Sequence, residues 1–324
     1  MSNSGTYTIF QEEWWLNAAA PGAWDAVEVE KGGELQARLP FSIQERWGTR
    51  TLTQPALTQS LGPWVKDTGA GYSRALSREM SLYQELIRKL PSHDMFHQNF
   101  APQVTNWLPF YWEDFSQTTR YTYTLNMEES LEKLQQGLDK TNRSRIRKAK
   151  ERLTLVRSDA DNLDVLLNLV DATFNRQALE TPFDRDYVHR LDEAIRKNAK
   201  RMITIAYDQD GNPHAGNYVM GDGRRMYALM SGVDTELRAS GAGVLTRWES
   251  IVWAHARTKI FDFEGSMLRG VEHRNRKYGA VQTPFFAISR SNGRVEAKRK
   301  LYRARRAPLV AVWKLKEQAL GLIR

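Results

Sequence analysis

The sequence predicts an α/β protein (α+β in some schemes) built from two similar units in tandem. The chain has 324 residues, and because a single domain usually takes about 100–200 residues, two domains are expected. Each half contains strand-like runs, a glycine-containing loop, a long helical segment and a returning strand. No low-complexity linker separates the halves. We therefore expect two tightly packed units, residues 1–150 and residues 151–324.

In the first unit, local patterns alternate between helices and strands. Runs rich in β-branched and aromatic residues indicate strands, and Lys31-Gly32-Gly33 is typical of the turn between the first two. Pro91 ends a long helical segment. The expected helices cover residues 11–19, 73–90 and 128–150, the last with a break near Gly137, and the expected strands cover residues 24–30, 35–43, 95–100 and 120–125.

The second unit repeats this alternation. The sequence Asp210-Gly211-Asn212-Pro213 is typical of a hairpin turn between two strands. Residues 294–324 form a basic and then amphipathic tail that could pack back on the first unit. The expected helices cover residues 162–178, 184–198, 243–257 and 267–277, and the expected strands cover residues 202–208, 214–220, 225–230, 260–263 and 281–288.

Composition narrows the classes of function. The chain has no cysteine, which excludes disulfides, thiol nucleophiles and thiolate metal sites and favours a cytoplasmic protein. No apolar run approaches the roughly 20 residues that a membrane span requires. The first residues are polar and do not form a secretion signal. We therefore expect a cytoplasmic protein without an integral membrane segment.

The charge balance favours an anionic partner. Formal net charge is +9 and the isoelectric point is about 9.6, which fits a nucleic acid, a phosphorylated substrate or a membrane surface. The two basic segments could equally be solvated helix faces. The first contains Lys140, Arg143, Arg145, Arg147, Lys148, Lys150, Arg152 and Arg157, and the second contains Arg294, Lys298, Arg299, Lys300, Arg303, Arg305 and Arg306.

The most informative stretch is a strand, a glycine loop and a helix in the second unit. The strand expected near residues 226–231 leads to residues 238–243, and apolar residues then recur at helical spacing. A helix N-terminus offers unpaired N–H groups and a favourable dipole to an anion. Glycine lets a phosphate approach the backbone closely. The residues expected to bind the donor's phosphates are Arg238, Ser240, Gly241, Ala242 and Gly243.

One alternative to this phosphate site remains open. A glycine-rich helix entry can exist without any ligand. The sequence lacks the other common phosphate loops, since neither G-x-x-x-x-G-K-[ST] nor a strand followed by G-x-G-x-x-G is present.

Several motifs together resemble one superfamily. The pattern Val233-x-x-x-x-Arg238-x-x-Gly241-x-Gly243 is similar to the acyl-CoA pyrophosphate loop of the GCN5-related N-acetyltransferase (GNAT) superfamily. The wider chain, most of residues 7–290, resembles the Fem-type (FemABX-like) branch with two tandem GNAT domains. The stretches that carry this likeness are Asn-Arg-Ser-Arg-Ile-Arg-Lys-Ala at residues 142–149, Phe-Asp-Phe-Glu-Gly-Ser at residues 261–266 and Arg-Lys-Tyr-Gly-Ala at residues 276–280.

This resemblance implies a fold and a reaction class. The fold would be two GNAT-like domains, each a mixed, mostly antiparallel sheet flanked by helices. The reaction would pass an acyl group from a thioester or ester donor to an amine. Fem-type members use aminoacyl-tRNA, whereas related tandem proteins are thought to use acyl-CoA. The intact R-x-x-G-x-G loop and the lack of a long inserted heptad arm favour acyl-CoA, and the basic segments favour tRNA.

Acyl transfer to an amine requires a base, donors for the developing oxyanion and an acid for the leaving group. Asp262 and Glu264 follow the donor helix and are expected to face the same way by strand alternation. Either could be the base, or both could form structural ion pairs or a cap. Glu264 is preferred because Gly265 would leave room for substrate. Tyr278 could be the acid, orient the substrate or simply pack.

The histidines do not form a pattern that predicts a metal site. His93 and His97 are four residues apart, but their segment reads as a strand and no third ligand is evident. His214 is expected to be exposed beside a turn.

Three functions remain open at this stage. The first is transfer of an acyl group, such as acetyl, from acyl-CoA to a small-molecule or lipid-linked amine, for example an amino sugar or an envelope or exopolysaccharide precursor. The second is aminoacyl transfer from aminoacyl-tRNA. The third is ligand binding on a GNAT-like scaffold without catalysis, because a fold does not determine a function.

Overall fold

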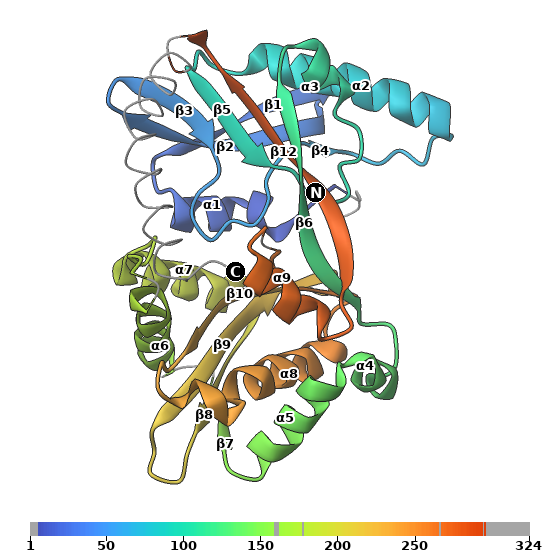
Figure 1. Cartoon of the computed structure of the whole chain (residues 1–324). Coiled ribbons are helices and arrows are strands. Elements are labelled where there is room, and N and C mark those ends of the chain that lie inside the picture. Colours follow the sequence, from blue (N-terminus) through green and yellow to red (C-terminus); the bar gives the residue numbers. More distant parts are fainter. Residues whose placement is uncertain (1–5, 159–161, 177, 266, 294, 296–324) are drawn as a thin grey trace, which may run out of the picture.

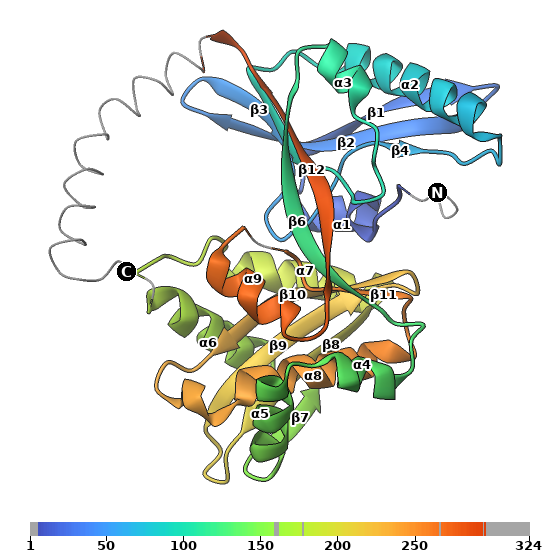
Figure 2. The ribbon, with the colours of Figure 1, turned by 45° about the vertical axis from the view of Figure 1, so that its right-hand side comes forward.

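The computed structural model describes residues 6–158, 162–176, 178–265, 267–293 and 295. Two lobes lie one above the other in Figure 1, and two long strands, β6 (Ser116–Asn126) and β12 (Val281–Ser291), run between them. Figure 2 shows the same two strands crossing from the lower lobe to the upper one. The lobes are therefore joined by paired strands and not by a simple linker.

The described strands form one mixed sheet that extends through both lobes. Its order is β1-β2-β3-β5-β12-β6-β11-β10-β9-β8-β7, with β4 paired to β2. Most neighbours are antiparallel, whereas β3–β5 and β10–β11 are parallel. The remaining strands are β1 (Trp24–Lys31), β2 (Glu34–Arg46), β3 (Thr49–Thr53), β4 (Trp64–Val65), β5 (Met95–Asn99), β7 (Thr154–Ser158), β8 (Lys200–Tyr207), β9 (Pro213–Gly221), β10 (Arg225–Val233) and β11 (Ile260–Asp262).

Helices cover the sheet in both lobes. In the upper lobe α2 and α3 lie on one side of the sheet, and in the lower lobe helices lie on both faces (Figure 1). The α-helices are α1 (Glu13–Ala19), α2 (Tyr72–Lys89), α3 (Leu108–Trp112), α4 (Leu131–Gly137), α5 (Lys140–Lys150), α6 (Leu163–Asn175), α7 (Arg185–Asn198), α8 (Ala242–His255) and α9 (Arg269–Arg276), and the 3-10 helices are η1 (Ile9–Gln11) and η2 (Leu237–Ser240).

Alternation along the strands of the lower lobe fills two separate cores. Tyr227 and Leu229 of β10 face the core beneath α6 and α7, whereas Met226 and Ala228 face the core beneath α5 and α8. The N-terminal helix α1 packs on α7, and Trp15 is fully buried in the lower lobe's core. An element from the start of the chain therefore stabilises the lobe that carries the glycine loop.

The two halves exchange strands. β12 follows α9 of the lower lobe, yet it pairs with β5 of the upper lobe, with Ala287 opposite Asn99. β6 pairs with β12 along most of its length and with β11 at its end, where Thr124 lies opposite Asp262. The end of β11 is thus fixed at the centre of the molecule. The expected boundary near residue 150 stays a prediction.

The α/β architecture with mixed sheets and flanking helices agrees with the sequence prediction. The long helix expected over residues 128–150 is two helices, α4 and α5, which meet near Gly137 as expected. The short strands β3 and β7 and the helix α3 were not expected. Trp112, at the end of α3, is 51% exposed. The basic tail, residues 294–324, lies outside the described residues except for Val295.

Candidate functional site

The glycine loop lies where a strand gives way to a helix, as the sequence predicts. β10 is followed by η2, and Gly241 then caps the N-terminus of α8 with a φ of 84°. A side chain there would be strained by that conformation, and its Cβ would lie 3.2 Å from the carbonyl oxygen of Arg145. The Ser240 hydroxyl accepts a hydrogen bond from Ala242 N–H at 3.3 Å. Arg238 is exposed beside this turn.

The first basic segment lies against this loop. Its residues up to Lys150 form α5, which packs on α8, and Ala149 Cβ lies 3.4 Å from the position that a Gly241 Cβ would take. Two of its cations are structural, because Lys150, at 2.9 Å, and Arg157 pair with the buried carboxylate of Glu249 on α8. Of the other cations, Arg145 lies next to the loop, because its carbonyl oxygen and Cβ lie 3.2 Å and 3.6 Å from the position of a Gly241 Cβ. The remaining cations of the segment are exposed: Lys140, Arg143, Arg147, Lys148 and Arg152.

Asp262 has a complete set of partners. The Thr122 hydroxyl donates to Oδ1, and Arg225 Nη1 lies 2.6 Å from Oδ2. The backbone N–H of Glu264 also donates to Oδ1, at 2.9 Å. The side chain is 1% exposed. These contacts are those of a structural ion pair, one of the two alternatives for this residue.

Glu264 differs from Asp262 in its surroundings. Its backbone is left-handed, with a φ of 52°, and β11 ends two residues earlier. Strand alternation therefore does not reach Glu264. The prediction that Asp262 and Glu264 face the same way by strand alternation was wrong. Its Oε1 is buried and has no hydrogen-bond partner among the described residues. Burial, and then the nearby Asp262 charge, raise the pKa of Glu264 well above 4.5, whereas Arg247 opposes this shift.

Gly265 was expected to leave room for substrate, but it packs closely against the backbone of β6. A Cβ on this residue would lie 1.9 Å from the carbonyl oxygen of Tyr121 and 2.2 Å from Thr122 Cα. Its N–H donates to Thr122 Oγ1 at 2.9 Å. The space beside Gly265 is therefore filled by the backbone of β6, and it does not admit substrate.

Tyr278 lies between the end of α9 and the first turn of α8. Its hydroxyl is 3.5 Å from the carbonyl oxygen of Val244, and its ring packs on Phe263 with centroids 5.4 Å apart. Burial raises the pKa of Tyr278 to about 12, and the positive charges of Arg247, Arg274 and Arg145 act in the opposite direction. The hydroxyl is thus protonated at neutral pH and lies close to the glycine loop.

Arg247 is a residue that the sequence analysis missed. It lies on α8, and its guanidinium carbon is 5.9 Å from the centre of the Phe263 ring. Its Nη1 is buried without a hydrogen-bond partner in the described structure, and burial lowers the pKa of Arg247 to about 10. An available signal was its position within the apolar stripe of α8, three residues after Val244 and directly before Trp248.

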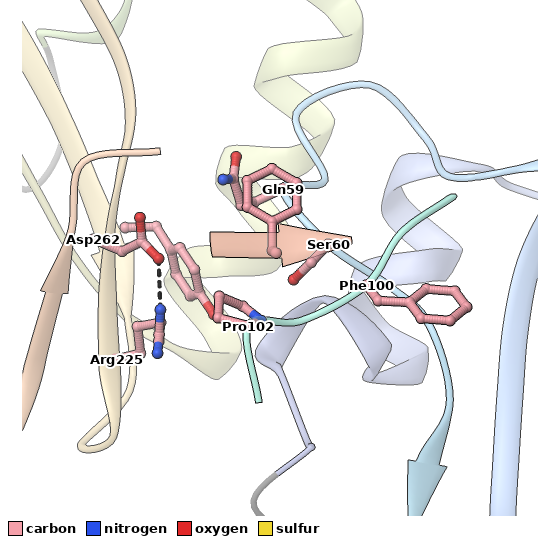
Figure 3. Close-up of a pocket in the computed structure, with 8 residues that line it drawn as sticks. Gln59, Ser60, Phe100, Pro102, Arg225 and Asp262 are labelled. Atoms are coloured by element: carbon pink, nitrogen blue, oxygen red, sulfur yellow. Dashed lines mark hydrogen bonds and ion pairs between the residues drawn. The ribbon is translucent and has the colours of Figure 1, made fainter. Parts of the chain in front are cut away.

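A small hollow opens at the junction of the lobes, on the side of Asp262 (Figure 3). The ion pair between Arg225 and Asp262 forms part of its wall, and Figure 3 shows this pair beside side chains of the upper lobe. Residues from both halves of the chain line this hollow, next to the end of β11. Its lining residues are Gln59, Ser60, Phe100, Pro102, Arg225, Tyr227, Asp262 and Phe285.

The histidines have local partners. His214 is 6% exposed, contrary to expectation, and its Nε2 lies 3.1 Å from Asp208 Oδ2. His93 Nδ1 lies 2.7 Å from the carbonyl oxygen of Pro91. Within the described ranges, no cluster of three or more histidine or acidic side chains could hold a metal ion, and no helix is long and apolar enough to cross a membrane.

Comparison with known proteins identifies the part of the chain that contains these residues. Residues 138–278 match the family model described as an acetyltransferase (GNAT) domain. This stretch is a GNAT acetyltransferase domain. It contains the glycine loop, α5, Glu264 and Tyr278, and the chain is accordingly an enzyme of the acyltransferase class.

Solved structures extend the likeness to both lobes. FemX matches with a TM-score of 0.66 at 14% identity, over 87% of this chain and 92% of that one. A tandem GNAT protein from the clavulanic acid biosynthesis pathway matches with a TM-score of 0.55 at 13% identity, over 84% of each chain. The C-terminal domain of a putative lysylphosphatidylglycerol synthetase from Agrobacterium fabrum matches with a TM-score of 0.53 at 13% identity, over 88% of each chain.

These likenesses show that the chain has the tandem GNAT fold of Fem-like proteins. No curated protein matches the sequence.

Proposed function

We propose that this enzyme transfers an acyl group, such as acetyl, from acyl-CoA to the amine of a small-molecule or lipid-linked acceptor. Acceptors of this kind include amino sugars and precursors of the cell envelope or of exopolysaccharide. The observation that carries the proposal is the glycine-capped N-terminus of α8 with the exposed cations of α5 beside it. A helix N-terminus and nearby cations fit the phosphates of coenzyme A. The proposed location is the cytoplasm, which the absence of cysteine favours.

In this proposal Glu264 is the base. Burial favours the neutral form of this carboxyl group in the free protein, because it raises the pKa well above 4.5. An ammonium group bound beside it would stabilise the carboxylate and lower that pKa, so that Glu264 would release its proton to solvent when the acceptor binds. The carboxylate could then accept a proton from the ammonium. The amine nitrogen then attacks the thioester carbonyl carbon, the carbon–sulfur bond breaks, and the remaining extra proton of the nitrogen passes to the thiolate of coenzyme A.

Tyr278 would assist the leaving group. Its hydroxyl is protonated at neutral pH and lies 3.5 Å from the carbonyl oxygen of Val244 in the first turn of α8. From this place it could donate a hydrogen bond to the departing thiolate of coenzyme A. Asp262 would have a structural role: it would fix the end of β11 and the backbone of Glu264.

A second candidate is aminoacyl transfer from aminoacyl-tRNA. The exposed cations Arg143, Arg145, Arg147 and Lys148 on α5 favour it, because an RNA backbone is recognised mainly through its charge. Two solved structures that share this fold are FemX and the C-terminal domain of a putative lysylphosphatidylglycerol synthetase.

Native mass spectrometry of the purified chain with a panel of acyl-CoAs and with charged tRNA tests the donor class. We expect a stoichiometric complex with an acyl-CoA, weakened about tenfold or more by Arg238→Ala through loss of a charge-assisted phosphate contact. Arg257→Ala, an exposed arginine beyond the other end of α8, is the matched control and should bind acyl-CoA normally. Binding of charged tRNA alone would replace the first proposal by the second.

A further inference from the structure

Two ionisable side chains of opposite charge type, one acidic and one basic, lie between α8 and the end of β11 without all of their hydrogen bonds. Glu264 Oε1 and Arg247 Nη1 are each buried without a hydrogen-bond partner in the described structure. A buried polar atom without a partner costs free energy, so native proteins usually satisfy such atoms. Two of them in one place indicate that a ligand is needed to complete the site.

The two groups do not satisfy one another. The charge of Arg247 acts on Glu264, yet no ion pair within 4.0 Å joins them among the described residues. Other buried carboxylates of the chain are paired closely, such as Asp262 with Arg225 at 2.6 Å. Arg247 and Glu264 are therefore near enough for the charge of one to act on the other, yet each keeps a buried polar atom that a ligand group could satisfy.

The charge of this site in the free protein favours an anion. Arg247 retains its positive charge at neutral pH, because its pKa of about 10 is still well above 7. Burial also favours the neutral form of Glu264, because it raises the pKa of this carboxyl group well above 4.5. Arg274 on α9 and Arg145 on α5 add positive charge near Tyr278.

We propose that the acceptor carries a carboxylate beside its amino group, as an α-amino acid does, with the carboxylate on Arg247 and the ammonium on Glu264. This inference rests on the proposed function and narrows its acceptor. A neutral amino sugar would offer Arg247 hydroxyl acceptors but no counter-charge, which is costly for a buried cation. A phosphate group would satisfy Arg247 but would offer no donor to Glu264. An amino group and a carboxylate on one carbon complete both groups.

The carboxylate does not react in this scheme. Glu264 loses its own proton to solvent when the acceptor binds, and its carboxylate then takes one proton from the ammonium. The nitrogen forms a bond to the acyl carbon, the bond from that carbon to sulfur breaks, and the second nitrogen proton passes to the coenzyme A thiolate. Arg247 is thus a binding residue that sets specificity, while Glu264 accepts the proton.

Matched pairs of acceptors test the inference with the full chain. Each pair is an L-amino acid and the amine that remains after loss of its carboxylate, for example phenylalanine and phenethylamine. Product is measured by mass spectrometry with acetyl-CoA present, and binding is measured by calorimetry without donor. We expect the amino acid to be favoured about tenfold or more in both measurements, the effect of one charge-assisted pair.

Variants at position 247 test whether Arg247 causes this preference for the amino acid. In Arg247→Met the preference should be lost while acetyl-CoA binding is unchanged, and in Arg247→Lys part of it should remain because the charge is kept. Arg257→Met is the matched control and should retain the full preference. Melting curves for each variant show whether it folds.

The outcomes separate this inference from the proposed function. Equal use or binding of the two members of every pair by the wild-type chain overturns the inference without any variant. A preference that persists in folded Arg247→Met also overturns it. If acetyl-CoA does not bind at all, the proposed donor is wrong, and the calorimetry without donor still decides whether a carboxylate is recognised.

Discussion

The guanidinium of Arg225 and the carboxylate of Asp262 lie 2.6 Å apart beneath the junction of the lobes, and together they connect three strands. Arg225 begins β10, Asp262 ends β11, and the Thr122 hydroxyl of β6 donates to the same carboxylate. The pair also holds Glu264, whose N–H donates to Asp262. The position of the proposed base thus depends on this ion pair.

Asp262→Asn should therefore destabilise the fold strongly. It leaves the 9%-exposed Arg225 without its counter-charge, a change that typically costs about 3–5 kcal/mol. Chemical denaturation of the variant and the wild type measures this difference. Glu193→Gln breaks only an exposed pair with Lys197 and should leave stability unchanged. A loss of activity in Asp262→Asn at full stability would contradict a structural role.

Glu264→Gln should abolish transfer and yet increase stability, increasingly so as the pH rises. The folded protein binds a proton on Glu264 at pH values where the unfolded chain has lost it, because the pKa is raised on folding. The free energy of unfolding of the wild type therefore falls as the pH rises above 4.5 towards that raised pKa. Glutamine does not titrate and lacks this cost.

Melting temperatures of Glu264→Gln and the wild type across pH 5–9 test the sign of that effect. A difference that does not grow with pH would show that the Glu264 carboxyl group is not held neutral by burial. For the active wild type, the same reasoning predicts that the rate increases with pH as Glu264 becomes able to accept a proton.

Tyr278→Phe should reduce kcat by about 100-fold or more and leave donor binding unchanged, as expected for loss of an assisting acid. The fold should persist, because the ring keeps its packing against Phe263. Rates and donor affinity are measured together. A change in donor affinity with an unchanged kcat would instead assign the hydroxyl to donor binding.

Gly265→Ala should destabilise the chain by more than the roughly 1–3 kcal/mol of ordinary overpacking, because the new methyl group meets the backbone of β6 and not a movable side chain. Gly223→Ala is the matched control, since no atom lies within 4 Å of a Cβ at that position. Thermal denaturation compares the two. Similar melting temperatures would show that β6 and Gly265 are not in close contact in solution.

Local patterns in the sequence predicted the elements that local forces determine. The turn at Gly241 and the start of α8 follow from glycine spacing and apolar periodicity. The pairing of β12 with β5 could not be read from the sequence, because strand partners distant in the chain leave no local pattern. The same holds for the close approach of Gly265 to Tyr121 and for the burial of Arg247. The roles assigned to Glu264, Tyr278 and the loop stay predictions.

The return of β12 to the upper lobe has a consequence for the order in which the molecule forms. Asn99 of β5 pairs with Ala287, so the inner edge of the upper sheet stays open until nearly the whole described chain has been synthesised. Domains usually fold as units, beginning with the N-terminal one during synthesis. Here the first lobe must wait for the last strand, and α1 must wait for α7. An open strand edge favours association with other chains, so the nascent protein is exposed to such association until β12 pairs with β5.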